Sequence, residues 1–283
     1  MMNFRKKEGS ITLFVLLALL FFTIILIGIF VSINNHRLIQ NAEENKVKDI
    51  YEKETENIDN VYLEILETGG NISLKELYPQ VTNWIPIYTR AHLEKIASNT
   101  KVNIEQENNK EYTFSNNTST GYILKNDIDL SGGNWASINS FSGVFYGNNK
   151  EINNMTINTT AGYKGFFSVN YGTIRNIKFK NIKLNIGPSS GGIVGENYGV
   201  IIECGVTGSI NCNSTEAHSY VGGITGYSSG NNAKITKSYN SASIKAKGFT
   251  GGISGLNSSS EISECFNTGE INGRKFNRRN FRI

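Results

Sequence analysis

Residue types that mark several common protein classes are scarce in this 283-residue chain, which has three cysteines, three prolines and three histidines. Three cysteines in a chain of this length do not suggest the disulfide framework of a small secreted domain, and no Cys-x-x-Cys pair indicates a metal site. The histidines lie far apart and outside any His-Glu-x-x-His motif, so no metal site is expected. A phosphate-binding loop ending in Gly-Lys-Ser/Thr is also missing, and we expect no bound cofactor.

Charge of one sign does not dominate either, because 28 basic and 24 acidic side chains leave a net charge of only +4. Much of the basic excess lies in residues 274–283, a basic tail. Its cations are Arg274, Lys275, Arg278, Arg279 and Arg282. The tail either contacts anionic cell-wall polymer or lipid, or it is the end of a truncated repeat. The chain lacks a patch of interleaved aromatic and basic residues, so we expect no nucleic-acid partner.

Glycine, by contrast, is abundant (29 residues) and marks a repeat in the second half of the chain. A glycine-centred phrase occurs four times, at spacings of 27 (165 to 192), 31 (192 to 223) and 29 (223 to 252) residues. The copies begin at Gly165, Gly192, Gly223 and Gly252, and the last three end at Gly195, Gly226 and Gly255. The first copy has Ser168 at that final position. Behind each copy comes an isoleucine and, three residues later, a small or apolar residue, in the pairs Ile174/Ile177, Ile201/Cys204, Ile235/Ser238 and Ile262/Cys265.

Self-similarity at this period indicates a stack of units, each of which buries its apolar side only against its neighbours. Short alternating runs such as Met155–Ile157 and Ile182–Leu184 are bounded by Gly, Asn and Ser, which is typical of strands and turns. A more diverged copy is expected at Gly143–Gly147, followed by Ile152/Met155. We therefore predict a parallel β-helix of about five rungs over residues 111–273.

Several phrases follow one another in order through the predicted β-helix. They are Tyr122–Leu130, Trp135, Phe141–Gly147, Ile152–Ile157, the Gly-Gly-Ile-x-Gly copies and Cys265–Gly269. Together they resemble the bacterial GLUG-motif repeat proteins, over a little more than half of the chain. The resemblance implies an all-β, right-handed parallel β-helix in a surface or secreted protein, from a family without assigned catalytic residues.

An uncharged and largely apolar run at residues 11–33 follows the basic cluster Arg5, Lys6 and Lys7. About 20 residues suffice to span the hydrocarbon core, whereas the apolar part of a cleavable signal has only about 7–15. The basic flank favours a cytoplasmic N-terminus. We therefore expect residues 1–33 to anchor the protein in the cell membrane as a single span, with the repeats outside the cell. A long cleaved signal peptide is the alternative.

The dipeptide Gly9-Ser10 before this run resembles the processing point of type IV and Tad-type prepilins. Those families place a glutamate five residues after the cut, where this chain has Phe14. The sequence therefore favours a plain anchor over a minor pilin-like component, and cleavage after Gly9 stays open.

Two helical segments are expected between the anchor and the β-helix. Within residues 34–70, apolar residues recur at three- and four-residue steps from Ala42 to Glu67, which predicts an amphipathic helical stalk. Residues 71–110 are expected to be a linker that contains a second helix near Thr89 to Ser98, with Thr89 as its N-cap. We expect this helix to cover the open end of the first rung.

Cys204 and Cys265 fall in one inward column, with Ser238 in the rung between them. Two rung steps separate the cysteines by ~9.6 Å, more than the Cα separation of about 7 Å that a disulfide allows, so both are expected to be apolar filler. Asn240 and Asn267 follow two residues later, where stacked asparagines can bond each other and the turn backbone. We interpret all of these residues as structural.

Asp127 and Asp129 form the best candidate acidic pair, because they lie on one side of a predicted strand. Paired carboxylates on a β-helix could bind calcium or cleave polysaccharide. Their place in the first rung favours capping and turn roles, so we expect neither catalytic nor metal-binding residues.

The sequence thus predicts a non-enzymatic, membrane-anchored surface β-helix for adhesion or envelope interaction. Its expected partners are the membrane, through residues 11–33, and cell-wall or host carbohydrate or protein. A polysaccharide-active lyase or hydrolase and a minor pilin-like component are the alternatives.

Overall fold

The computed structural model describes Leu20 and residues 74–214, 216 and 219–274. The predicted stalk, the Gly9-Ser10 processing point, residues 275–283 of the basic tail and, apart from Leu20, the predicted anchor lie outside these residues. In the described part of the chain, no helix has the length and apolarity needed to cross a membrane.

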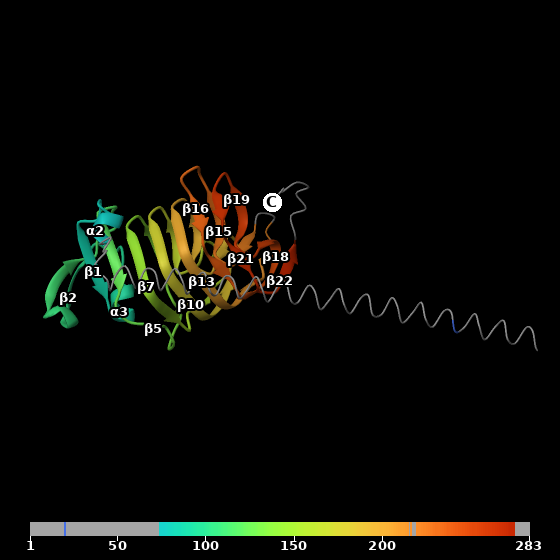
Figure 1. Cartoon of the computed structure of the whole chain (residues 1–283). Coiled ribbons are helices and arrows are strands. Elements are labelled where there is room, and N and C mark those ends of the chain that lie inside the picture. The colour runs from blue at the N-terminus through green and yellow to red at the C-terminus, as the bar shows by residue number, and fades with distance from the viewer. Residues whose placement is uncertain (1–19, 21–73, 215, 217–218, 275–283) are drawn as a thin grey trace, which may run out of the picture. The chain divides into compact units, whose positions relative to one another are not determined.

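From residue 83 onward the chain winds into a right-handed parallel solenoid of about six turns (Figure 1). This confirms the predicted all-β coil, with one turn more than the five expected. Within the solenoid, each strand pairs in parallel with the strand one turn later, so one turn is one repeat. The larger sheet contains β1 (Asn83–Ile87), β4 (Thr120–Leu124), β5 (Ile128–Asp129), β7 (Val144–Asn153), β8 (Thr156–Asn158), β10 (Thr173–Ile186), β11 (Ser190–Gly191), β13 (Val200–Cys212), β14 (Tyr220–Gly222), β16 (Lys234–Thr236), β17 (Tyr239–Asn240), β18 (Ser243–Gly251), β20 (Glu261–Ser263), β21 (Phe266–Asn267) and β22 (Ile271–Arg274). The smaller sheet contains β6 (Ile138–Phe141), β9 (Phe167–Asn170), β12 (Val194–Asn197), β15 (Thr225–Ser229) and β19 (Ser254–Ser258).

The strand register stacks the repeat columns one above another. In the larger sheet, Ile174 pairs with Ile201, Ile201 with Ile235, and Ile235 with Ile262. In the smaller sheet, strands β9, β12, β15 and β19 pair in the same order as the four glycine phrases. The two anchors of the repeat therefore lie in different sheets of the same turn.

The predicted early copy at Gly143–Gly147 is wrong. This segment lies in β7 of the larger sheet, where Phe145 pairs with Ile174, and Ile152 pairs with Phe179. The strand that continues the glycine phrases is β6, in which Ile138 pairs with Phe167. The glycines at both ends of Gly143–Gly147 resemble the repeat phrase, whereas β6, the strand at the equivalent place, contains no glycine.

The parallel ladder begins at β1, earlier than the predicted boundary at residue 111, so residues 71–110 are more than a linker. The remaining elements of this segment are α2 (Leu74–Leu77), α3 (Arg90–Leu93), a 3-10 turn (Glu105–Glu107) and the antiparallel hairpin of β2 (Lys101–Ile104) and β3 (Lys110–Thr113). The β1 sequence contains Pro86, which argues against a central strand, but β1 lies at the edge of its sheet, where proline is tolerated.

Helix α3 closes the first turn of the coil. The Thr89 hydroxyl accepts a hydrogen bond from the backbone N–H of His92 and caps the helix, as predicted. Leu93 and Ile96 are buried and join the apolar core. This short segment therefore supplies apolar cover within the first turn, as a solenoid end requires.

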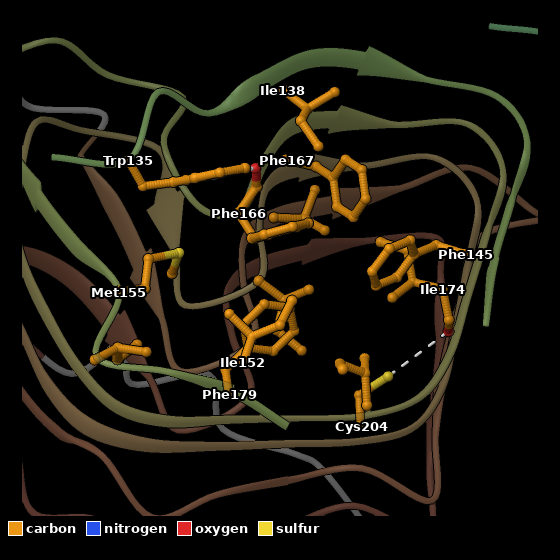
Figure 2. Packing of buried hydrophobic residues seen from close by; sticks show 14 of the residues in the cluster. Trp135, Ile138, Phe145, Ile152, Met155, Phe166, Phe167, Ile174, Phe179 and Cys204 are labelled. Atoms are coloured by element: carbon orange, nitrogen blue, oxygen red, sulfur yellow. Dashed lines mark hydrogen bonds between the residues drawn. The ribbon is translucent and has the colours of Figure 1, made fainter. Parts of the chain in front are cut away.

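The core is one continuous apolar column inside the coil (Figure 2). Its N-terminal half is aromatic: Trp135 stacks on Phe166 with 4.8 Å between ring centroids, and its indole N–H donates to the carbonyl oxygen of Phe166. Further along, Ile193 and Ile224 are fully buried, whereas Ile253 is partly exposed and packs against the same core. Burial between successive turns holds the coil together.

Close approach of two strand layers requires glycine at the end of the last three repeat phrases. A Cβ atom on Gly226 would lie 2.3 Å from the backbone nitrogen of Ser190, and one on Gly255 would lie 2.3 Å from that of Val221. Neither glycine has a positive φ. Contact distance, and not turn geometry, therefore selects glycine here.

Candidate functional site

The cysteine column predicted from the sequence lies inside the coil. The Ser238 hydroxyl accepts a hydrogen bond from the backbone N–H of Cys204 at 3.1 Å, and neither Cys204 nor Cys265 forms a disulfide. Burial raises the pKa of the Cys204 thiol to about 12 and that of Cys265 to about 11. Both are therefore neutral at physiological pH and are not activated nucleophiles.

Asn240 and Asn267 lie one above the other at an inner corner of the coil. The Asn240 amide donates to Asn267 Oδ1 at 2.7 Å and to the carbonyl oxygen of Ala242. The phrase glycines pack against these amides, because a Cβ atom on Gly223 would lie 2.2 Å from Asn240 Cγ.

A second inner ladder was not foreseen from the sequence. Asn170 donates to Asn197 Oδ1 at 2.8 Å, and Asn197 donates to Ser228 Oγ at 3.2 Å. All three side chains are fully buried. The signal in the sequence is the phrase Asn-Tyr-Gly, which occurs at 170–172 and again at 197–199.

The carboxylates of Asp127 and Asp129 accept hydrogen bonds from backbone and side-chain groups. Asp127 Oδ1 accepts a hydrogen bond from the backbone N–H of Glu151 at 2.9 Å. Asp129 accepts from the hydroxyl and N–H of Ser131 and from the amide of Asn154. Donation by Ser131 and then by Asn154 holds the pKa of Asp129 below its ordinary value. Both carboxylates therefore accept structural hydrogen bonds, within their own loop and from the following turn of the coil.

Two stretches, 187–191 and 226–230, have the Gly-x-Ser-x-Gly spacing of a nucleophile elbow. Ser228 in the second stretch is buried in the inner ladder, and Ser189 in the first is also buried. His92, the histidine within the described ranges, lies in the first turn and accepts a hydrogen bond at Nδ1 from the N–H of Tyr88. The described residues therefore bring no histidine to either serine.

Each asparagine of the Asn170–Asn197 ladder is followed in sequence by a tyrosine, and the two tyrosine rings stack on the outside of the coil. We call Tyr171 and Tyr198, one turn apart, the tyrosine column. Their ring centroids lie 5.3 Å apart with only 12° between the ring planes. Tyr227 closes the C-terminal side of the column by an edge contact with Tyr198.

The column ends abruptly at Tyr171. Because Phe141 pairs with Asn170, Ser142 occupies the place of Tyr171 one turn earlier. One face of the Tyr171 ring lies against Tyr198, and on the opposite side the residue in register is Ser142, which has no ring to stack on it. The Tyr171 side chain is accordingly 58% exposed, one of the most exposed large apolar groups in the described structure.

A groove of about 260 Å³ lies along this open face, and we call it the tyrosine groove. Its walls include Tyr171, Tyr198 and the backbone of the glycine that follows each of them. Neutral polar side chains from widely separated parts of the chain complete it, namely Gln80, Thr118, Ser142, Thr173 and Asn232. Two larger hollows, of about 510 and 480 Å³, have no aromatic ring in their walls.

The electrostatics of the tyrosine groove are neutral. None of the described residues that line it is charged. The Tyr198 hydroxyl donates to Glu196 at 3.3 Å, and burial together with this carboxylate raises the pKa of Tyr198 to about 12. The phenol is therefore protonated at physiological pH. The groove thus combines an aromatic face with neutral hydrogen-bonding groups.

Comparison with known proteins identifies the fold alone. No family model and no curated protein sequence matches the chain. Among solved structures it is similar to a "putative immunoglobulin A1 protease" from Bacteroides ovatus, with a TM-score of 0.51 and 23% sequence identity. The likeness covers 67% of this chain and 58% of the other, so this chain spans less than two thirds of its neighbour's length. Similarity at this level shows a shared architecture and carries no activity.

Proposed function

We propose that this chain is a membrane-anchored cell-surface protein whose β-solenoid binds carbohydrate at the tyrosine groove without cleaving it. The apolar run at residues 11–33 supports the anchor. One observation carries the binding function: the open face of Tyr171 lies above Ser142, within a groove of neutral hydrogen-bonding side chains.

Carbohydrate matches this groove because a sugar ring combines two kinds of surface. Its C–H groups carry partial positive charge and are attracted to the negative face of an aromatic ring. Its hydroxyl groups donate and accept hydrogen bonds, as do the side chains of Gln80, Thr118 and Asn232. A groove this small contacts few sugar units, so we expect weak single-site binding that gains strength when many copies are displayed on a surface.

Binding without cleavage is favoured by the contacts of the acidic and nucleophilic groups. Asp127 and Asp129 are held by turn hydrogen bonds, Ser228 is buried and Cys204 is neutral. A protease activity, which the name of the structural neighbour would suggest, needs a nucleophile beside a base, and none of the described groups supports that alternative.

Tyr171→Ala tests the proposal. Full-length wild type and variant, in detergent micelles, are applied to a panel of immobilised polysaccharides. Removing the ring should weaken binding at least about tenfold, which corresponds to about 1.4 kcal/mol. Tyr163→Ala is the matched control, because Tyr163 is 51% exposed and does not line the groove, and this variant should bind like wild type.

Equal binding by wild type and Tyr171→Ala would contradict a role for the groove. Binding of a proline-rich peptide, with no polysaccharide bound, would also contradict the proposal, because such peptides dock in aromatic-lined grooves as well.

A further inference from the structure

We infer, building on the proposed carbohydrate-binding function, that the tyrosine groove selects neutral glycans and takes one pyranose ring into the gap above Ser142. The inference runs against the charge of the whole chain, since a net charge of +4 would favour an acidic polymer. Two features of the described structure carry it, namely the height of the gap and the pairing of the cations around it.

The gap has the height of one sugar ring. Successive turns are ~4.8 Å apart, so replacing one ring of the column by Ser142 leaves ~9.6 Å between Tyr171 and the turn that precedes Ser142. Thr118 also lines the groove, and it belongs to the segment one turn before Ser142, because Gly121 pairs with Val144. A ring held between two surfaces at van der Waals distance needs roughly 7–8 Å, twice the usual contact of ~3.5–4.0 Å.

The gap therefore admits a ring that Tyr171 covers on one side and neutral side chains meet on the other. Ser142 and Thr173 contribute hydroxyl groups to its lining, and Asn232 contributes an amide. Each of these groups can donate and accept, which suits the hydroxyl groups of a neutral sugar.

Cations on the neighbouring strands are already engaged with acidic side chains of adjacent turns. Arg175 binds Glu203 through two hydrogen bonds of 3.0 and 3.1 Å. Lys234, the first residue of β16 and two residues after Asn232, forms an ion pair with Glu261 at 2.7 Å. The carboxylate of Glu196 lies beside Tyr198.

An acidic sugar would gain little from this environment. A uronate or phosphate group in the groove would lose hydration without meeting a lining cation, and it would approach the Glu196 carboxylate. Acidic glycans are therefore excluded by desolvation and repulsion, and neutral ones are not.

The test compares neutral polysaccharides (a β-glucan, a mannan and a galactan) with acidic ones (polygalacturonate and hyaluronate), using the full-length protein. At least one neutral glycan should bind, and its affinity should change less than about twofold between about 50 and about 500 mM NaCl, because no ion pair is formed. The acidic glycans should bind at least about tenfold more weakly, a difference of about 1.4 kcal/mol.

Ser142→Tyr tests the gap itself. The added ring should extend the tyrosine column by one turn, cover the open face of Tyr171 and reduce neutral-glycan binding at least about tenfold. Ser140→Tyr is the matched control, because it adds the same ring two residues earlier, within β6, where Ser140 lines a different hollow, and it should bind like wild type. Circular dichroism verifies that both variants keep the strand content of wild type.

The two proposals fail in different ways. If an acidic glycan binds best and Ser142→Tyr abolishes that binding, selection of neutral sugars is wrong while the carbohydrate site stands. If Ser142→Tyr and Tyr171→Ala both bind every glycan like wild type, the site itself is wrong.

Discussion

The choice of single residues in this solenoid is decided by the turn above and the turn below. Gly226 is glycine because the backbone of Ser190 occupies the space of a side chain. Ser168 stands at the equivalent position of the first copy, where its buried hydroxyl makes no hydrogen bond to a described residue. On the outer surface, the small side chain of Ser142 lies in register with Tyr171 and leaves one face of that ring uncovered.

Gly226→Ala should destabilise the protein by about 1–3 kcal/mol, the usual cost of overpacking. The new Cβ atom would lie 2.3 Å from the backbone nitrogen of Ser190, so a strand must move. Urea unfolding followed by circular dichroism measures the change. Ser168→Ala, in the same column, should leave the free energy of unfolding almost unchanged, because it removes a hydroxyl without a partner. Equal stability of wild type and Gly226→Ala would show that the two layers are not in close contact.

At the scale of strands and ladders, the sequence predicts what repeats and fails where the repeat is broken. The isoleucine columns follow from the period alone, because the same place in successive turns is buried and favours an apolar side chain. Strand β1 was not predicted because Pro86 is unusual within a strand. Strand β6 was not predicted because it lacks the glycines of the later repeat phrases. The inner ladder contains Asn170 and Asn197 but then Ser228, so the hydrogen bond continues along the ladder while the residue type changes.

The tyrosine groove was beyond prediction for a similar reason. Gln80 and Asn232 are far apart in the chain and meet at the groove only through the coiling of the intervening turns. The Asn-Tyr-Gly phrases could have indicated stacked tyrosines. The open end of the column depends on Ser142, whose register with Tyr171 the sequence alignment did not identify.

Asn197→Ala should cost about 1–3 kcal/mol of unfolding free energy, because it leaves buried hydrogen-bonding groups without their partner. Asn197 accepts from Asn170 and donates to Ser228 and to the carbonyl oxygen of Gly199. The control is Asn185→Ala on the exposed outer face, which should change stability by less than about 0.5 kcal/mol. Urea midpoints at matched slopes give both values, and equal losses in the two variants would contradict a special role for the inner ladder.

At the scale of the whole solenoid, stacked turns form a regular scaffold, and the candidate site lies where the tyrosine column is interrupted at Ser142. Every turn contributes apolar side chains to one core, which is aromatic in the first turns and aliphatic further along. The groove arises where the tyrosine column stops and loops from both directions contribute Gln80 and Asn232. The net positive charge of the chain has no part in this site, whose lining is uncharged.

A crystal structure of the protein with a short neutral oligosaccharide, chosen from the polysaccharide that binds best, tests the central claim most directly. Our account predicts a pyranose ring against the exposed face of Tyr171, above Ser142, with its hydroxyl groups bonded to Thr118, Gln80 or Asn232. A sugar bound elsewhere on the solenoid, with the Tyr171 face empty at saturating ligand, would contradict it.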